Sequence, residues 1–177
     1  YNIGMVVVCS GLIIFNKVIA KILFANEFYR AWEYAPFLMI SVVFGALSSV
    51  LGGIFTATKQ SKLIGQTTVI GAVINIILNI ILVYGMGPVG AAIATMISYA
   101  VVWIIRIKYV KKIIPFSVKN RINNLSYIIL LIQAILMIVI RNIIITTFLE
   151  LLGFLIIIIL YYKELKIILG KIVTKLK

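Results

Sequence analysis

The sequence contains no histidine, one cysteine and four acidic residues in 177 positions. A lone Cys9 excludes a disulfide within the chain, and the lack of histidine excludes a mixed Cys/His metal site. The acidic residues are all glutamates, and each falls near the end of an apolar run: Glu27, Glu33, Glu150 and Glu164. An enzyme needs an acid, base, nucleophile or metal where bonds change. Because such groups are few and scattered, the sequence predicts a protein that is not an enzyme and holds no metal.

The sequence is rich in hydrophobic residues. Hydrophobic residues make up 64% of it, charged residues 12%, and the mean hydropathy is +1.23. Soluble domains carry about 45–50% apolar and about 25% charged residues, so the composition indicates an integral membrane protein. The chain opens on Tyr1 without a basic segment or a cleavage motif of small residues. We therefore expect part of a longer protein rather than a precursor with a signal peptide.

Runs of about 20 apolar residues, the length needed to cross a bilayer core about 30 Å thick, occur repeatedly. They predict an all-α fold, a polytopic membrane bundle of six transmembrane helices. The expected spans are Ile3–Phe24, Tyr34–Thr56, Leu63–Tyr84, Pro88–Val110, Leu125–Ile145 and Phe148–Tyr162, the last two joined around Thr146-Thr147. The expected division is four helices in 1–110, a basic loop at 111–124, two additional helices in 125–162, and a basic tail at 163–177 forming an interfacial helix.

The third and fourth spans form a predicted hairpin, because they meet at Gly85-Met86-Gly87-Pro88-Val89. On each limb, small and polar residues recur at helical spacing on one face while isoleucines occupy the other. Small residues let membrane helices approach closely. The residues expected to mediate this helix packing are Gly45, Gly52, Gly71, Gly90 and Ala94.

Positive charge is distributed unevenly among the gaps between spans, which predicts topology. One set of alternate gaps holds thirteen Lys and Arg residues, with Arg106 counted among them, and the other holds Arg30 and Arg141. Cytoplasmic loops carry an excess of Lys and Arg. Both ends of the chain are therefore expected in the cytoplasm. The same residues offer a surface for anionic lipids, whereas binding of nucleic acid is not expected from charges that lie between membrane spans.

A few polar residues inside or beside the spans are candidates for binding a substrate: Asn75, Asn79, Lys17, Lys21 and Arg141. Each also has a simpler interpretation. The two asparagines can form hydrogen bonds between helices, and the three cationic side chains can reach the membrane surface as anchors. No cofactor is expected, and H⁺ or Na⁺ stays a possible coupling ion. Proton coupling would require a buried carboxylate, and none is expected in this chain.

Several motifs resemble a known family. Asn75-x-x-x-Asn79, Tyr84-Gly85 and Gly90-Ala91-Ala92-Ile93-Ala94-Thr95 are similar to the late helices of bacterial polysaccharide transporters, as are Trp32-Glu33-Tyr34-Ala35-Pro36 and Gly52–Lys62 upstream. These transporters are the O-antigen and capsule flippases of the multidrug/oligosaccharidyl-lipid/polysaccharide exporter superfamily. The resemblance implies that the six spans are helices nine to fourteen of a fourteen-helix, two-lobe transporter in a bacterial cytoplasmic membrane.

By this resemblance, the cargo would be an oligosaccharide on a polyprenyl diphosphate, moved from the inner to the outer leaflet by alternating access. A polysaccharide polymerase or glycosyltransferases would then be partners. A multidrug antiporter or a lipid II flippase of the same superfamily stays an alternative. The absence of proline from the Lys59–Lys62 loop favours the polysaccharide branch over lipid II flippases. A membrane-bound polymerase or a non-transporting scaffold is the third alternative.

Overall fold

The computed structural model describes residues 1–23, 26–114, 120–140, 142–167 and 170, and the ordered elements in this part of the chain are all helices. They are α1 (Asn2–Leu23), the 3₁₀ helix η1 (Asn26–Glu33), α2 (Ala35–Ala57), α3 (Lys62–Ile113), α4 (Asn120–Val139) and α5 (Ile143–Leu160). Five of these helices are long and apolar enough to cross a membrane. The predicted all-helical membrane bundle is therefore confirmed, whereas the count of six spans stays a prediction.

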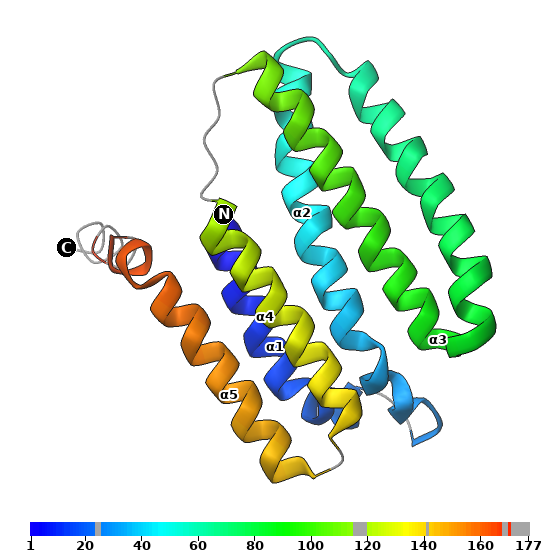
Figure 1. The fold of residues 1–177 in the computed structure, drawn as a ribbon, viewed down its shortest axis with the longest axis vertical. Helices are drawn as coiled ribbons and strands as arrows, with labels where there is room; N and C mark the ends of the chain where they lie inside the picture. The colour runs from blue at the N-terminus through cyan, green and yellow to red at the C-terminus, as the bar shows by residue number, and fades with distance from the viewer. Residues whose placement is uncertain (24–25, 115–119, 141, 168–169, 171–177) are drawn as a thin grey trace. The chain divides into compact units, whose positions relative to one another are not determined.

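The number of membrane spans depends on how helix α3 is counted. Its 52 residues would measure about 78 Å if straight, far more than the roughly 30 Å of a bilayer core. The helix is interrupted at Gly87, whose φ of 55° and ψ of −136° lie outside the helical region, and Pro88 starts the second limb. Figure 1 shows the two limbs running side by side in opposite directions. The predicted hairpin is confirmed by this geometry.

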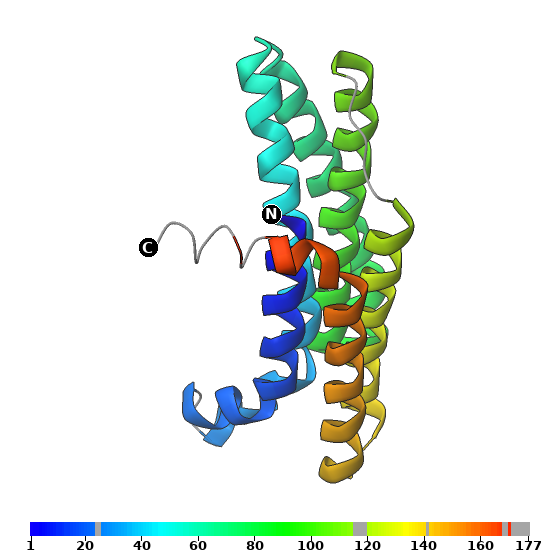
Figure 2. The same ribbon diagram turned by 90° about the vertical axis from the view of Figure 1, so that its left-hand side faces the viewer.

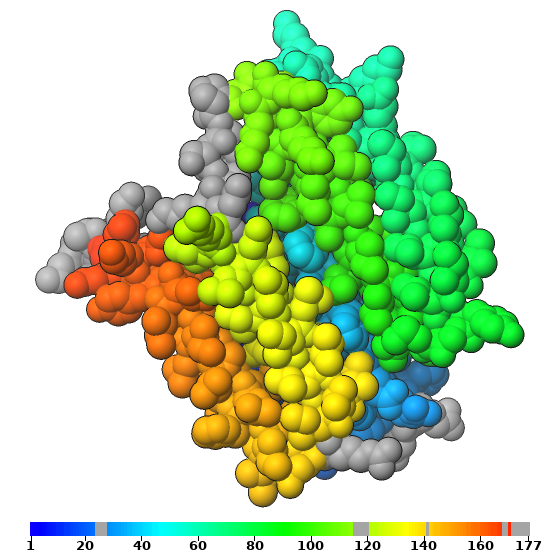
Figure 3. All heavy atoms as spheres, in the orientation of Figure 1, coloured from blue at the N-terminus to red at the C-terminus, as the bar shows by residue number. Residues whose placement is uncertain are grey.

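The chain divides into two compact units, and α3 lies in the unit that comprises Asn16–Val118. In this unit α2 packs against α3, and the space-filling view shows the two limbs of α3 in contact along much of their length (Figure 3). A core of Leu51, Phe55 and Val110 fills the space between α2 and α3. Outward-facing isoleucines such as Ile77 and Ile81 are exposed, as expected for a lipid-facing surface.

A tight turn joins α2 to α3. Lys59 adopts a left-handed backbone with φ of 58°, and the N–H of Gln60 donates to the carbonyl of Phe55 at 2.7 Å. This bond closes the end of α2 in the manner of a Schellman motif. The turn returns the chain so that the first limb of α3 runs antiparallel to α2 (Figure 1).

The other unit comprises Tyr1–Phe15 and Lys119–Lys177, and here α4 and α5 lie alongside each other in both ribbon views (Figures 1 and 2). The predicted connection at Thr146-Thr147 is wrong, because both threonines lie inside α5. Helix α5 begins earlier because Asn142 caps it, its side-chain oxygen accepting from the N–H groups of Ile144 and Ile145.

Parts of two sequence predictions lie outside the described residues. The basic loop at 111–124 includes residues 115–119, and the basic tail at 163–177 includes residues 168–169 and 171–177. The helix that follows Tyr161 covers residues 162–167, which agrees with the helical part of the tail prediction as far as it is described.

Candidate functional site

A cavity of about 420 Å³ lies between α2 and the two limbs of α3. Its volume falls within the range of about 300–1,000 Å³ that is typical of ligand sites. Hydroxyl and amide groups supply most of its polar lining: Ser48, Ser49, Thr68, Asn75, Thr95 and Ser98. Tyr99 and Arg106 complete the set of large side chains around it. Three helical segments therefore converge on one cavity whose lining includes several polar groups.

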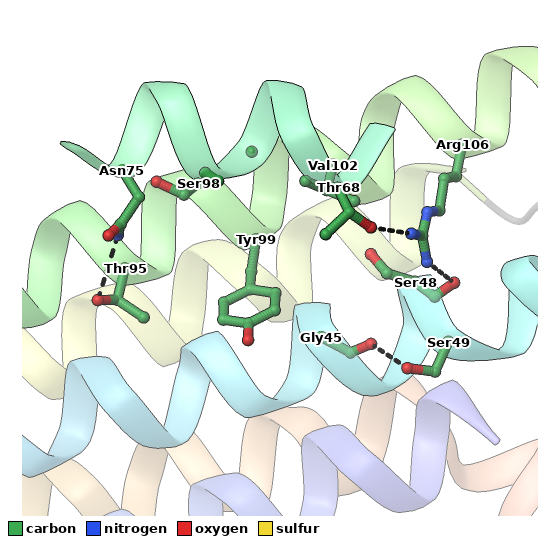
Figure 4. Close-up of a pocket in the computed structure, with 12 residues that line it drawn as sticks. Gly45, Ser48, Ser49, Thr68, Asn75, Thr95, Ser98, Tyr99, Val102 and Arg106 are labelled. Carbon is green, nitrogen blue, oxygen red and sulfur yellow. Dashed lines mark hydrogen bonds between the residues drawn. The ribbon is translucent and has the colours of Figure 1, made fainter. Parts of the chain in front are cut away.

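Arg106 closes one end of this cavity and is only 6% exposed (Figure 4). Its Nε donates to Thr67 Oγ1 at 3.0 Å, and its Nη1 donates to the Ser48 carbonyl at 2.8 Å. Its Nη2 donates to Thr68 Oγ1 at 3.1 Å and to the Ile64 carbonyl at 3.4 Å. The guanidinium therefore links α2 to both limbs of α3.

All the hydrogen-bond acceptors of Arg106 are neutral oxygens. Carbonyl and hydroxyl groups satisfy guanidinium N–H donors but do not cancel the positive charge. An arginine at the centre of a membrane helix costs about 2.5–3.5 kcal/mol on insertion scales, and the cost is smaller for Arg106, which lies nearer the Lys111 end of its limb. Arginines within spans accordingly face the interior of a bundle or a water-filled cavity, and they mark the paths of substrates. Arg106 has the placement of such a residue.

Ser48 presents a second polar group to the same end of the cavity. Its side chain is 3% exposed, and within the described part of the chain its Oγ has no hydrogen-bond partner. Buried hydroxyls are nearly always hydrogen-bonded, so an orphaned one calls for an explanation. The neighbouring Ser49 differs, because its hydroxyl donates to the Gly45 carbonyl of its own helix at 3.0 Å.

The opposite end of the cavity is neutral. Asn75 Nδ2 donates to Thr95 Oγ1 at 3.4 Å, across the two limbs of α3. Residues twenty positions apart would be about 30 Å apart in a straight helix, so this bond requires the fold-back at Gly87. Figure 4 shows the ring of Tyr99 between this end and the Arg106 end.

Asn79 does not line the cavity with Asn75. It lies one turn further along the first limb, and its Nδ2 donates to the carbonyl oxygen of Asn75 at 2.9 Å and to Asn75 Oδ1 at 3.0 Å. Asn79 thus holds the amide of Asn75 in place, and of the two predicted asparagines only Asn75 faces the cavity.

The three cationic candidates are placed away from this cavity or not described. The ammonium of Lys17 lies 4.5 Å from the centre of the Trp32 ring, a cation–π contact, and Asn16 Nδ2 donates to the Trp32 carbonyl at 2.8 Å. These contacts fasten α1 to η1. Lys21 is exposed in the last turn of α1, and Arg141 lies outside the described residues.

The 3₁₀ helix η1 carries its own surface ion pair. Arg30 Nε lies 3.1 Å from Glu33 Oε1, and this hydrogen bond, together with the carboxylate charge, raises the pKa of Arg30. The side chain of Glu27 lies outside the described residues.

The predicted packing glycines lie where helices approach each other. A side chain at Gly71 would meet Val102 on the other limb, and a Cβ at Gly45 would lie 3.3 Å from the Tyr99 ring. A Cβ at Gly52 would lie 3.4 Å from Arg106 Nη1. Gly90 packs directly on the Leu82 carbonyl beside the turn, and Ala94 is fully buried.

Sequence reasoning missed both Arg106 and Ser48 as site residues. Arg106 was counted as a loop residue, but it lies within α3, which continues to Ile113. A signal was present, because the small face of the second limb continues at intervals of four from Gly90 through Ala94 and Ser98 to Val102 and Arg106. The topology prediction does not change when Arg106 is left out, because the other twelve Lys and Arg residues of that set of gaps still outnumber the two of the other set.

The expectation that no carboxylate is buried is also wrong. Glu150 is 1% exposed in α5. Near it, Ser10 Oγ donates to Gln133 Oε1 at 2.9 Å, and Gln133 Nε2 donates to the Glu150 carbonyl at 3.0 Å. This network links α1, α4 and α5 within the unit that comprises Tyr1–Phe15 and Lys119–Lys177.

The fold and the cavity together define a helical membrane protein with a polar site inside its bundle. The chain is 31% identical over 117 residues to the probable low-salt glycan biosynthesis flippase Agl15 of Haloferax volcanii, covering 66% of this chain and 24% of the relative. It is 29% identical over 107 residues to an uncharacterised membrane protein of Methanocaldococcus jannaschii, covering 60% of this chain and 21% of that relative. The chain thus spans about a quarter or less of the curated relatives it matches. No protein-family model and no solved structure matches the chain significantly.

Proposed function

We propose that this chain is part of a flippase that moves an oligosaccharide carried on a polyprenyl diphosphate from the inner to the outer leaflet by alternating access. The repeat unit of an O-antigen, a capsule or another surface polysaccharide is the cargo class that the family resemblance implies. The chain would form helices nine to fourteen of the transporter and contribute one wall of the transport path.

The observation that carries this proposal is the cavity between α2 and the hairpin of α3. Transporters place substrate groups in a cavity inside the bundle, at helices that can shift relative to each other. The hydroxyl and amide groups of Asn75, Thr95 and Ser98 match the hydrogen-bonding chemistry of sugar hydroxyls. No covalent chemistry is needed for such a role.

The similarity to Agl15 supports the same class of function, because that relative is described as a glycan biosynthesis flippase. Both relatives are archaeal. We therefore propose that the protein lies in the cytoplasmic membrane of a prokaryote, and the bacterial assignment stays a prediction. Both ends of the chain are proposed to be cytoplasmic, where anionic lipids would contact the basic segments. A polymerase or glycosyltransferases are proposed partners.

The test is transport by the complete protein in liposomes. Fluorescent lipid-linked oligosaccharide is incorporated in both leaflets, and a membrane-impermeant quencher reports how much of it becomes accessible outside. We expect accessibility to rise beyond the outer-leaflet fraction in liposomes with protein and to stay at that fraction in empty liposomes. An equal signal in both would contradict the proposal.

Deletion of the gene in its host gives an independent check. We expect lipid-linked oligosaccharide to accumulate on the cytoplasmic face and surface glycan to be lost. Normal surface glycan in the deletion strain, with no other transporter induced, would contradict the function.

The buried Glu150 favours a second candidate, an ion-coupled antiporter of the same superfamily. Ionisable groups inside spans often form proton relays in transporters. This candidate requires an H⁺ or Na⁺ gradient and efflux of a drug such as ethidium. Ethidium efflux driven by an imposed pH gradient, with no flipping of lipid-linked sugar, would favour it over the flippase.

A further inference from the structure

Arg106 and Ser48 form one chemically distinct end of the cavity. The guanidinium carries a charge that its hydrogen-bond partners, all of them neutral, leave uncancelled. Beside it, Ser48 Oγ is buried and has no partner within the described residues. The two residues are linked directly, because Arg106 Nη1 donates to the Ser48 carbonyl and leaves the Ser48 hydroxyl unused (Figure 4).

A purely structural role accounts for only part of this arrangement. Arg106 does fasten α2 to both limbs of α3, and the backbone carbonyl of Ser48 is enough for that purpose. A structural link does not need the Ser48 hydroxyl, and the four hydrogen bonds that the guanidinium makes to neutral oxygens leave its positive charge uncancelled. An anion with several acceptor oxygens uses both features, because it neutralises the guanidinium and accepts from the hydroxyl.

The position of this end along α3 indicates which leaflet it serves. Arg106 lies five residues before Lys111, about 7.5 Å along the helix axis, and Thr67 lies five residues after Lys62 on the first limb. Lys59, Lys62, Lys111 and Lys112 are exposed at this end. In the proposed topology it faces the cytoplasmic leaflet, where a lipid-linked sugar would be assembled.

We propose that Arg106 and the Ser48 hydroxyl bind the diphosphate of the lipid carrier at the cytoplasmic leaflet, and so form the site at which cargo is loaded. This inference rests on the proposed function and names the residues that recognise the anionic part of the cargo. The neutral end at Asn75 and Thr95 is then left for the sugar. Exposed lysines at the same end attract the anion before it reaches the cavity.

The experiment measures binding to the complete protein in nanodiscs with three probes: a polyprenyl diphosphate, the uncharged polyprenol and inorganic diphosphate. We expect Arg106→Gln to weaken binding of the polyprenyl diphosphate about tenfold or more, since a charge-assisted hydrogen bond is lost. Ser48→Ala should weaken it about threefold to fivefold, while the backbone bond to Arg106 is kept. Binding of polyprenol should be unchanged in both variants.

Ser41→Ala is the matched control on the same helix. Ser41 is buried like Ser48, but its hydroxyl donates to the Leu38 carbonyl at 2.7 Å and does not line the cavity. We expect this variant to bind all three probes as the unaltered protein does. Ser48→Ala keeps the test decisive even where Arg106→Gln fails to fold, because it leaves every hydrogen bond of Arg106 in place.

The inference would be overturned if Ser48→Ala and folded Arg106→Gln both bound polyprenyl diphosphate as tightly as the unaltered protein. If the unaltered protein still transported lipid-linked sugar, the proposed function would stand. Inorganic diphosphate that binds as tightly as the lipid would overturn the assignment to a lipid carrier. Binding that depends on both residues in a protein that flips no lipid-linked sugar would instead contradict the proposed function and keep the anion site.

Discussion

The two compact units of the chain differ in the arrangement of many of their buried polar side chains. In the unit comprising Tyr1–Phe15 and Lys119–Lys177, polar side chains bond one another, as when Ser126 Oγ lies 2.9 Å from the Tyr161 hydroxyl and Tyr127 donates to Asn2 Oδ1 at 2.7 Å. In the unit comprising Asn16–Val118, polar groups line an open cavity, and among the described residues the buried Arg106 donates to neutral oxygens. The first arrangement holds helices together, and the second is suited to a ligand.

This difference follows from what polar groups need inside a membrane. A buried donor or acceptor must find a partner, because lipid offers none. Where helices supply that partner to each other, the network stabilises the bundle. Where a hydroxyl such as that of Ser48 lacks one within the described residues, a ligand, water or another part of a longer protein can supply it. Substitutions of the polar groups described above should therefore affect mainly stability in the first unit and mainly transport in the second.

The largest effect is expected for Arg106→Gln. Loss of the charge removes the anion contact, and the link between α2 and the two limbs of α3 is weakened as well. We predict a fall of about tenfold or more in the initial rate of flipping in liposomes. Arg106→Lys keeps the charge but not the planar fork, and it should recover part of the rate. If a folded Arg106→Gln protein flipped lipid at the rate of the unaltered protein, the assignment of transport to the unit that contains Arg106 would be contradicted.

Gly71→Ala tests the close approach of the hairpin limbs. A Cβ at this position would meet the Val102 side chain, so Val102 or the limb that carries it must shift, and overpacking of this kind costs about 1–3 kcal/mol. The thermal midpoint of the complete protein in detergent should fall by several degrees. Gly65→Ala is the control on the same limb, because a Cβ there meets nothing within 4 Å and the midpoint should hold or rise. Equal midpoints for both variants would contradict the described hairpin.

Gln133→Leu tests the bonded network of the first unit. The change removes the bonds to Ser10 and to the Glu150 carbonyl, each worth about 0.6 kcal/mol on average between membrane helices. We predict a loss of about 1 kcal/mol in the free energy of unfolding and a flipping rate close to that of the unaltered protein. A strong loss of transport at unchanged stability would assign this network to the transport path.

The smallest effect is expected for Asn79→Ala. Within the described residues its amide bonds only to Asn75 on its own helix, so we predict a change of about 0.5 kcal/mol or less in stability and less than about a twofold change in rate. Asn75→Ala, which also breaks the contact with Thr95 across the limbs, should reduce the rate more. A reversal of this order in the flipping assay would show that Asn79 contacts cargo.

The hairpin, the lipid-facing isoleucines and the small faces were predictable because they follow from local spacing and from a turn that needs glycine. The placement of Arg106 was not, because hydropathy places any charge near a span end at the membrane surface. Its burial depends on carbonyl and hydroxyl groups that α2 and the first limb bring to it, which are distant in sequence.

Glu150 shows how one boundary error changes the chemistry that is inferred. With a span starting at Phe148, Glu150 lies at the membrane edge. Because Asn142 caps α5 and the helix starts at Ile143, Glu150 lies seven residues inside it, about 10.5 Å along the axis. The run of isoleucines after Asn142 contains no charge that would mark this start.

The most direct test of the central claim is photo-crosslinking of the complete protein with a lipid-linked oligosaccharide that carries its reactive group beside the diphosphate. Mass spectrometry then identifies the modified residues. We predict label on α2 around Ser48 and on the second limb of α3 around Arg106, with loss of label when unlabelled polyprenyl diphosphate competes. Label confined to α4 and α5, or label that competitor does not displace, would contradict the claim that this cavity binds the carrier.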